Sequence, residues 1–490
     1  MPKFEIKNRK TGTVIFSGRA GSLKELVQSA ATAGLDGTMP NLILAKVGIK
    51  KAEKVKLYNA DLAATDLSEI DLTQAVLSGA DLTGSDLSGS DLSAADFSSA
   101  NLSRGYLQSA ILSGTNFTQA NLSGASLTGA KLDGTDLTEA NLSGADLTKT
   151  KLNRATWTKV DFSGAHLPSA DLSKMRLTGN KMKGVDLSFA QLTGATLTNV
   201  DLSEARIERA NLSSCNLSGS RLIGADLTEA NLTGADLSNA NLERAKLSSA
   251  TLNDAKLTGA NLKGAKLDGA KLKSADLSGA RLAGSELNEA DMTAAKLTGA
   301  DLSEALLRRA ILKGADLSHV EAANARLPGA DLSEADAAEG QFPGADLSSV
   351  RMEKGDLSSA DLSSANLSEA KFDQVKLVRA KLVNAVMARG QFHAVDASGA
   401  DMRGVDLSES DLHGSKLDST DLSGSQLCGA KLSGISMLGA RIVQADLTRA
   451  DFSWAVIDDT DFSGVKVGQT SFRGAQIKNV KGIRFKKKEQ

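Results

Sequence analysis

Residues 224–242 read GADLTEANLTGADLSNANL, and this stretch decides the fold. Leucine stands at every fifth position, and a small residue stands two places before each leucine. A period of five matches neither the 3.6-residue turn of a helix nor the two-residue alternation of a flat strand. The chain must therefore change direction every five residues.

The same period runs through most of the 490-residue chain. From Leu57 to Ile477 there are 85 consecutive five-residue repeats, here called phrases, with no change of register. Of their central positions, 82 hold large apolar residues. The residue two places after the centre is often glycine, and the residue one place after it is proline at Pro168, Pro328 and Pro343. This combination is typical of a type II turn, whose second central residue needs a positive φ. Each phrase therefore predicts a short extended piece and a corner.

Four corners close a square, so twenty residues predict one coil that stacks on the next through backbone hydrogen bonds. One coil cannot be stable alone. Burying one leucine contributes roughly 1.5–3 kcal/mol, whereas ordering five backbone residues costs on the order of 5–10 kcal/mol. Stability must come from stacking many coils, and small residues at the second inward position let the walls approach each other.

The A(D/N)LxG phrases, as in ANLSGADL at 140–147, resemble the repeats of the pentapeptide-repeat family. The resemblance implies an all-β solenoid, namely a right-handed quadrilateral pentapeptide-repeat β-helix of about 21 coils with a small α+β N-terminal cap. The expected domains are a hairpin-plus-helix cap at 1–50, the β-helix at 51–480 and a basic tail at 481–490.

The N-terminal segment is expected to cap the first coil. FEIKNRKTGTVIFSG predicts a β-hairpin around its KTG turn, and Ser22 with Glu25 forms a capping box for a helix that stops at Gly34. Residues 1–56 hold 11 lysines and arginines against 4 acidic residues, so partner docking is the alternative. The basic tail is expected to cover the last coil, and nucleic-acid binding is the alternative.

Composition narrows the class of protein. Cys215 and Cys428 are too few for a disulfide framework and lack the spacing of a zinc site. There is no signal-peptide pattern and no run of 18 apolar residues, so a cytoplasmic protein is expected. There is no phosphate-binding loop, and no serine or threonine has a base beside it in a defined cleft. The sequence therefore predicts no catalytic residue, no cofactor, no metal and no enzyme.

Departures from the core pattern favour packing over chemistry. The three small centres, Ala322, Ala337 and Ala397, lie close to Phe342 or Phe392, which indicates conserved core volume, with a ligand cavity as the alternative. Twenty-residue steps back from Trp157 predict an aromatic ladder through Leu137, Phe117 and Phe97. The phrase SKMRLTGNKMKG places Met175 and Asn180 where small residues belong, and this predicts local widening.

Two histidines, His393 and His413, are one coil apart and should stack on one face with Asp373. One interpretation is that this column binds a divalent metal ion, but the spacing of residues stacked on successive coils is loose for a tetrahedral metal site. Solvated surface residues are expected.

Residues 57–103 hold eight acidic residues and no lysine or arginine. These residues are the candidate interaction patch: Asp61, Asp66, Glu69, Asp71, Asp81, Asp86, Asp91 and Asp96. Stacking should place Asp61 over Asp81, Asp66 over Asp86 and Asp71 over Asp91, where like charges repel. A functional surface is one explanation, and solvation of a common repeat residue is the other.

The function that best fits is a non-enzymatic, rod-like scaffold for protein–protein interaction. The alternative, which the family resemblance implies, is a DNA-mimicking binder of DNA gyrase or topoisomerase IV. Segment 246–273 is locally basic, which argues against a continuous DNA-like surface. The expected partner is a protein, with a type II topoisomerase as one candidate and neither nucleic acid nor membrane involved. The oligomeric state stays open.

Overall fold

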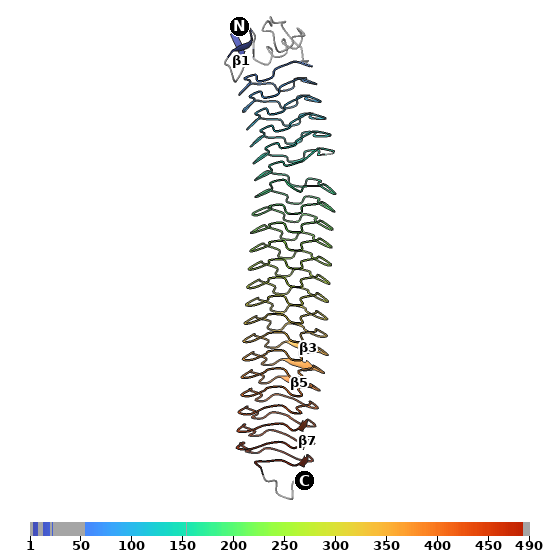
Figure 1. Cartoon of the computed structure of the whole chain (residues 1–490), viewed down its shortest axis with the longest axis vertical. Coiled ribbons are helices and arrows are strands. Elements are labelled where there is room, and N and C mark those ends of the chain that lie inside the picture. The colour runs from blue at the N-terminus through green and yellow to red at the C-terminus, as the bar shows by residue number, and fades with distance from the viewer. Residues whose placement is uncertain (1–2, 8–12, 20–21, 23–53, 153, 484–490) are drawn as a thin grey trace. The chain divides into compact units, whose positions relative to one another are not determined.

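The computed structural model describes residues 3–7, 13–19, 22, 54–152 and 154–483. It forms two compact units, Met1–Asn231 (unit 1) and Leu232–Gln490 (unit 2). The repeats of both units form all-β solenoids, and the described residues contain no helix, so none that is long and apolar enough to cross a membrane (Figure 1).

The N-terminal segment contains two paired strands. Strand β1 (Lys3–Lys7) runs antiparallel to β2 (Val14–Arg19), with Phe4 opposite Gly18. These are the strands of the predicted hairpin. The helix predicted after Ser22, and residues 484–490 of the basic tail, lie outside the described residues.

The phrase around Leu237 shows how one repeat is built in unit 2. The backbone N–H groups of Leu237 and Asn239 donate to the carbonyls of Lys256 and Thr258, at 2.7 and 2.9 Å. The N–H of Ala240 donates back to the Leu237 carbonyl at 2.9 Å and closes the corner. Bonds of the first kind join residues one coil apart, so the twenty-residue coil predicted from the sequence is present.

Each corner places its third residue in the left-handed region, as a type II turn requires. Asn239 has φ 56° and Arg244 has φ 56°, while Gly279 has φ 62°. Glycine suits this conformation but is not required there. The turn bond and the inter-coil bonds on either side hold non-glycine residues in it, at a cost of about 1 kcal/mol each.

Pairing lengthens into three-residue strands at two places in unit 2. Strands β3 (Arg351–Glu353), β4 (Lys371–Asp373) and β5 (Gln391–His393) form one parallel sheet. A second parallel sheet consists of β6 (Ser436–Leu438), β7 (Val456–Asp458) and β8 (Gln476–Lys478). Elsewhere on the walls of the coils, single bridges join residues 20 apart.

The core is continuous along each unit and follows the predicted columns. Phe97 and Phe117 stack with ring centroids 5.2 Å apart, as the aromatic ladder predicts. The three small centres, Ala322, Ala337 and Ala397, are buried. A Cβ added to Gly340 would lie 2.6 Å from the ring of Phe342. The absence of a side chain at Gly340 therefore leaves room for the ring of Phe342. The volume conservation expected at the three alanine centres stays a prediction.

The ladder of unit 1 is interrupted at one level. Among the described residues, no bridge joins Lys151 to Asp171 or Thr156 to Arg176, although each of the four is bridged to a coil on its other side. The flanking walls keep their bridges, Asp146–His166 and Asp161–Lys181. Figure 1 shows the coils spaced more widely at this level than above and below it. The break adjoins Met175 and Asn180, where the sequence predicts widening.

Candidate functional site

The eight acidic residues of the first coils lie around the solenoid rather than along one side. Bridges pair Asp61 with Asp81, Asp66 with Asp86 and Asp71 with Asp91, on three successive walls, as expected. Asp96 lies on the fourth wall, paired with Val76 and Asn116, and Glu69 lies at a corner with φ 55°. We call this set of eight residues the acidic belt.

Most of these carboxylates also accept a hydrogen bond from a backbone N–H of their own phrase. The N–H of Ser93 donates to Asp91 Oδ1 at 3.0 Å, and the N–H of Ser98 donates to Asp96 Oδ1 at 3.0 Å. The N–H one place after the core residue lies at the corner, where the ladder offers it no carbonyl. The sequence analysis missed this role, although aspartate two places before serine or threonine is a signal for such an Asx turn.

Amides continue the acidic columns into the next coils. Asn101 Nδ2 lies 3.4 Å from Asp81 Oδ1, and Asn121 Nδ2 donates to Asn101 Oδ1 at 3.0 Å. On a neighbouring wall, Tyr106 follows Asp86 in the ladder and is 51% exposed. The belt therefore borders an amide ladder on one wall and an exposed aromatic ring on another.

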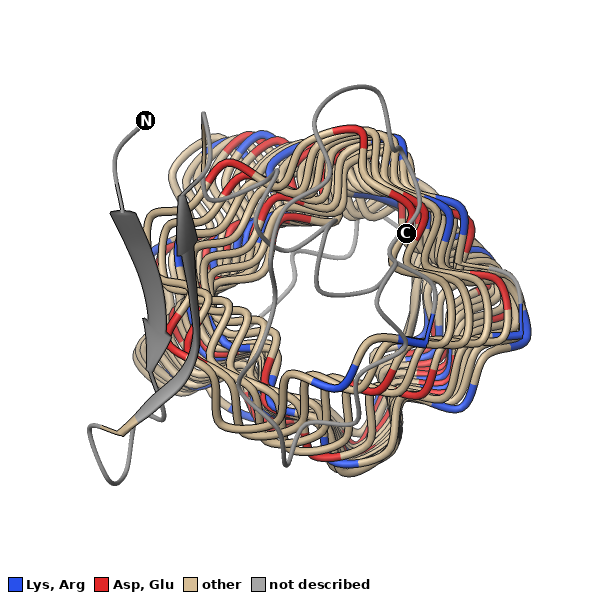
Figure 2. Cartoon of the chain, turned by 90° about the horizontal axis from the view of Figure 1, so that it is seen from above, with Lys and Arg blue, Asp and Glu red and all other residues tan. Residues whose placement is uncertain are grey.

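Beyond the belt, many acidic residues are paired with a basic residue one coil away. Lys181 Nζ lies 3.2 Å from Asp161 Oδ2, and Lys376 Nζ lies 3.0 Å from Asp356 Oδ2. Arg209 binds Glu229 through two bonds of 3.0 Å, and these hydrogen bonds lower the pKa of the Glu229 carboxyl. Figure 2 shows basic residues in blue and acidic residues in red on the walls of the coils. Ion pairs of this kind recur beyond the belt, whereas residues 57–103 contain no lysine or arginine.

The repeat itself decides the family. The family model described as "Pentapeptide repeats (8 copies)" matches sixteen segments, most of them overlapping, between residues 56 and 474. The chain belongs to the pentapeptide-repeat family. Pentapeptide-repeat proteins are generally structural or binding proteins. A search of curated protein sequences finds no match to this chain.

Solved structures of other pentapeptide-repeat proteins are similar to this chain. HetL of the cyanobacterium Nostoc, involved in heterocyst differentiation regulation, is 30% identical over 45% of this chain and 90% of HetL, with a TM-score of 0.34. A trypsin-treated form of QnrB1, a plasmid-mediated fluoroquinolone resistance protein, is 18% identical over 41% of this chain and 88% of QnrB1, with a TM-score of 0.22. A protein of the Arabidopsis thaliana thylakoid lumen is 31% identical over 26% of this chain and 71% of that protein, with a TM-score of 0.15.

The pentapeptide-repeat walls of unit 2 carry a shallow hollow of about 700 Å³ over β3, β4 and β5. Lys371, Asp373 and His393 are among its lining residues, and Asp373 pairs with His393 as the sequence predicted. The imidazole of His393 lies 3.8 Å from the carboxylate of Asp411. Within the described part of the chain, no three histidine, cysteine or acidic side chains gather as a metal site.

One serine–histidine contact was not anticipated from the sequence. His413 Nδ1 lies 3.1 Å from the Ser433 hydroxyl, one coil further on. Both residues lie on the outer surface. Asp411 Oδ1 accepts from the His413 backbone N–H at 3.2 Å, but among the described residues no acidic side chain forms an ion pair with the His413 imidazole. The contact is a surface hydrogen bond between stacked coils, and only the twenty-residue step could have revealed it.

The two cysteines of the pentapeptide-repeat chain are free, Cys215 buried and Cys428 partly exposed. Burial raises the pKa of the Cys215 thiol to about 11. Its Sγ donates to the Leu192 carbonyl at 2.6 Å. Cys215 therefore acts as a small core residue, as its inward position predicts.

Proposed function

We propose that this chain is a non-enzymatic scaffold and that its acidic belt binds a basic surface of another protein. One observation carries the proposal: eight acidic residues occur between 57 and 103 without a lysine or arginine, whereas later carboxylates such as those of Asp161 and Asp356 have a lysine one coil away. Stacked like charges raise the free energy of the isolated protein. A basic partner that neutralises them recovers this energy on binding.

The belt favours a partner that wraps around the coils or touches adjacent walls. Bridges place its aspartates on all four walls, so no single flat face collects them. Electrostatic complementarity of this kind raises the association rate and makes binding depend strongly on salt. The exposed ring of Tyr106 offers an aromatic contact beside Asp86.

A type II topoisomerase is the specific partner to examine next, because the density of carboxylates in the belt is what a DNA-mimicking surface requires. The alternation of acidic and basic residues beyond the belt supports the more general scaffold. If the chain is a mimic, purified protein should inhibit gyrase supercoiling or protect gyrase from a quinolone at micromolar concentration. No effect on either activity would remove the topoisomerase hypothesis.

The proposal is tested by exchanging charge while keeping each corner intact. A belt variant changes the seven aspartates to asparagine and Glu69 to glutamine, since asparagine also accepts the corner N–H. A control variant removes eight carboxylates that are ion-paired elsewhere: Asp161, Asp356, Asp361, Asp396, Asp411, Asp421, Asp446 and Glu229.

Affinity capture followed by mass spectrometry should recover a partner with wild type and with the control variant. The belt variant should lose it, and binding by wild type should weaken steeply as salt rises. Recovery of the same partner by the belt variant would show that the belt is only solvated surface.

A further inference from the structure

The break in the unit 1 ladder leaves two edges of backbone facing each other. In intact phrases the core residue and the corner residue donate to the next coil, but the N–H groups of Leu152 and Trp157 have no such bond among the described residues. The carbonyls of Thr150 and Ala155 likewise receive no N–H from the following coil. Unpaired strand edges are templates for an added strand.

Two buried side chains add further unpaired donors at this level. Trp157 is 6% exposed and Asn180 is 5% exposed, and neither the indole Nε1 nor the amide Nδ2 has a partner in the described part of the chain. Asn180 Oδ1 accepts from the Val160 N–H at 2.8 Å, in place of the usual corner carbonyl. A buried N–H without an acceptor costs about 1–3 kcal/mol. The site therefore requires acceptor atoms.

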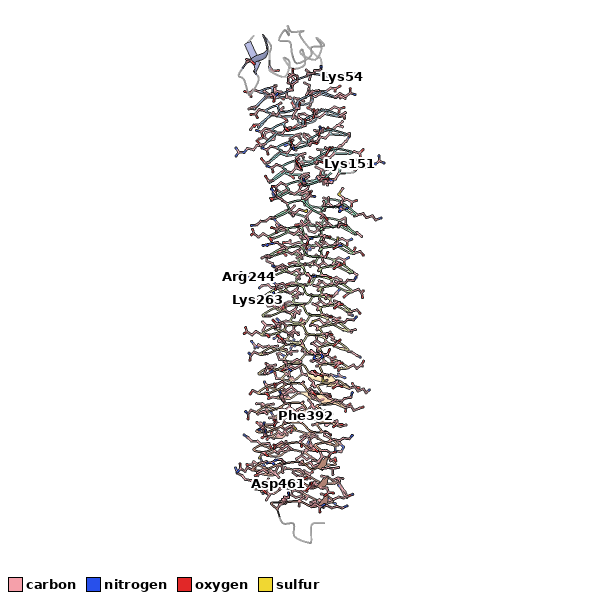
Figure 3. The ribbon with its side chains drawn as sticks, in the orientation of Figure 1. Lys54, Lys151, Arg244, Lys263, Phe392 and Asp461 are labelled. Atoms are coloured by element: carbon pink, nitrogen blue, oxygen red, sulfur yellow. The ribbon has the colours of Figure 1, made fainter. Side chains whose placement is uncertain are left out.

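The rim of the opening is basic. Lys149, Lys151 and Arg154 lie on one coil, and Lys174 and Arg176 lie on the next, and none of them forms an ion pair within the described residues. Figure 3 shows the Lys151 side chain pointing away from the coils. Neighbouring lysines on the same coils, such as Lys159 and Lys181, are by contrast paired with acidic residues.

Acidic groups are few at this edge. Asp171 faces the opening from the second coil, but its carboxylate accepts from the Ser173 N–H at 3.1 Å and is turned toward its own corner. Asp161 is engaged by Lys181. The charges and the unpaired N–H groups together favour a ligand that brings acceptors and negative charge.

We propose that this opening binds an extended acidic peptide segment of a partner protein, which adds one strand between the two coils. A peptide fits better than a small anion because the facing edges offer carbonyls as well as N–H groups. A strand satisfies both, and its acidic side chains reach the basic rim on the outside. This site lies outside the acidic belt, and its test is independent of the function proposed above.

Crowding in the core explains why the coils separate here. Trp157 and Phe162 have ring centroids 5.2 Å apart, and Met175 and Asn180 occupy positions that are small in most phrases. Adding volume to a packed core moves the backbone rather than compressing the side chains. Met175→Ala combined with Asn180→Ala should therefore close the ladder and abolish the site.

The test uses Trp157 as its own reporter. Trp157 and Trp454 are the two tryptophans of the chain, so Trp454→Phe leaves one indole. A peptide of about ten residues that alternates glutamate and valine is long enough to span two walls. Titrating it should change the Trp157 emission and protect the amides of Leu152 and Trp157 from hydrogen exchange. A lysine–valine peptide of equal length should do neither.

Two kinds of variant distinguish the contribution of the basic rim from that of the opening itself. Lys151→Glu with Arg154→Glu should weaken the acidic peptide at least tenfold, whereas the matched reversal Arg244→Glu with Lys263→Glu in unit 2 should leave its affinity unchanged. The closing variant should lose binding while the protein stays folded by circular dichroism.

Three results would overturn the proposal. The first is an unchanged Trp157 emission at saturating peptide. The second is exchange at Leu152 and Trp157 that is as slow in the free protein as at Leu142, which would mean that the ladder is closed in solution. The third is inorganic phosphate producing the same emission change and displacing the peptide, which would leave a simple anion site.

Discussion

The aspartate before each core residue acts first on its own corner. At Asp461, the Ser463 hydroxyl donates at 2.6 Å and the Ser463 N–H donates at 2.9 Å (Figure 3 labels Asp461). These two bonds, the hydroxyl bond first, hold the pKa of the Asp461 carboxyl below its usual range. Charge and hydrogen bonding are therefore separable contributions at this position.

Replacing Asp461 should separate them. Asp461→Ala removes the acceptor and should lower the free energy of unfolding by about 1 kcal/mol at pH 7, whereas Asp461→Asn should cost less. The folded pKa lies below the unfolded value, so the advantage of the charge is present above the unfolded pKa and is lost as pH falls through the folded pKa. Urea unfolding at pH 7 and pH 3 should show wild type and Asp461→Asn converging at the lower pH. An asparagine variant as unstable as the alanine variant at pH 7 would contradict the corner role.

One substitution should have opposite effects at two adjacent residues. Ala294 is an exposed corner residue with φ 55°, and Ala295 is a fully buried inward residue. Ala294→Gly should stabilise the protein by about 1 kcal/mol because it relieves the left-handed conformation. Ala295→Gly should destabilise it by about 1 kcal/mol because it removes a buried methyl group. Thermal unfolding compares the two, and equal signs would contradict the corner assignment.

At the scale of the repeat, the features that depend only on residue spacing could be predicted from the sequence. The coil, the corner, the buried column and the stacking of Asp61 on Asp81 all follow from the period of five. The role of aspartate in the corner is a local hydrogen bond, and the composition could not separate it from solvation. The His413–Ser433 contact and the length of β3–β5 depend on side-chain conformation and on small changes in coil spacing, which no pattern of residue types encodes.

Core volume within one wall is shared between the inward glycine and the aromatic centre. A Cβ at Gly390 would overlap the ring of Phe392, which meets Phe372 edge-on at 5.6 Å. Gly390→Ala should therefore cost about 1–3 kcal/mol. Phe392→Leu should recover part of this loss when the two changes are combined, so their effects should not add. Additive effects in chemical unfolding would show that the two residues do not compete for space.

Within each unit, a coil is bonded to the coil before it and the coil after it, so stability should be local. Leu277 is buried in unit 2, and Leu277→Ala should destabilise its surroundings by about 2–5 kcal/mol. Hydrogen exchange should accelerate at Leu257 and Leu297, one coil away, and stay unchanged at Leu417. The surface change Asp276→Asn is the control in the same phrase. Uniform acceleration throughout unit 2 would mean that the unit unfolds as one body.

The twenty-residue step also decides which changes of length a unit can accept. Adding or removing a whole coil leaves every later residue in its own column, so aromatic rings, amide ladders and ion pairs keep their neighbours. Removing a single phrase between Asp361 and Lys381 keeps the leucines inside but turns everything beyond it by one wall relative to the coils before it. Asp361 would then no longer lie beside Lys381, and every ion pair that spans the deletion would be lost, whereas pairs wholly beyond it would stay one coil apart. The contacts of the outer surface therefore depend on the twenty-residue coil, whereas the buried core depends only on the five-residue phrase.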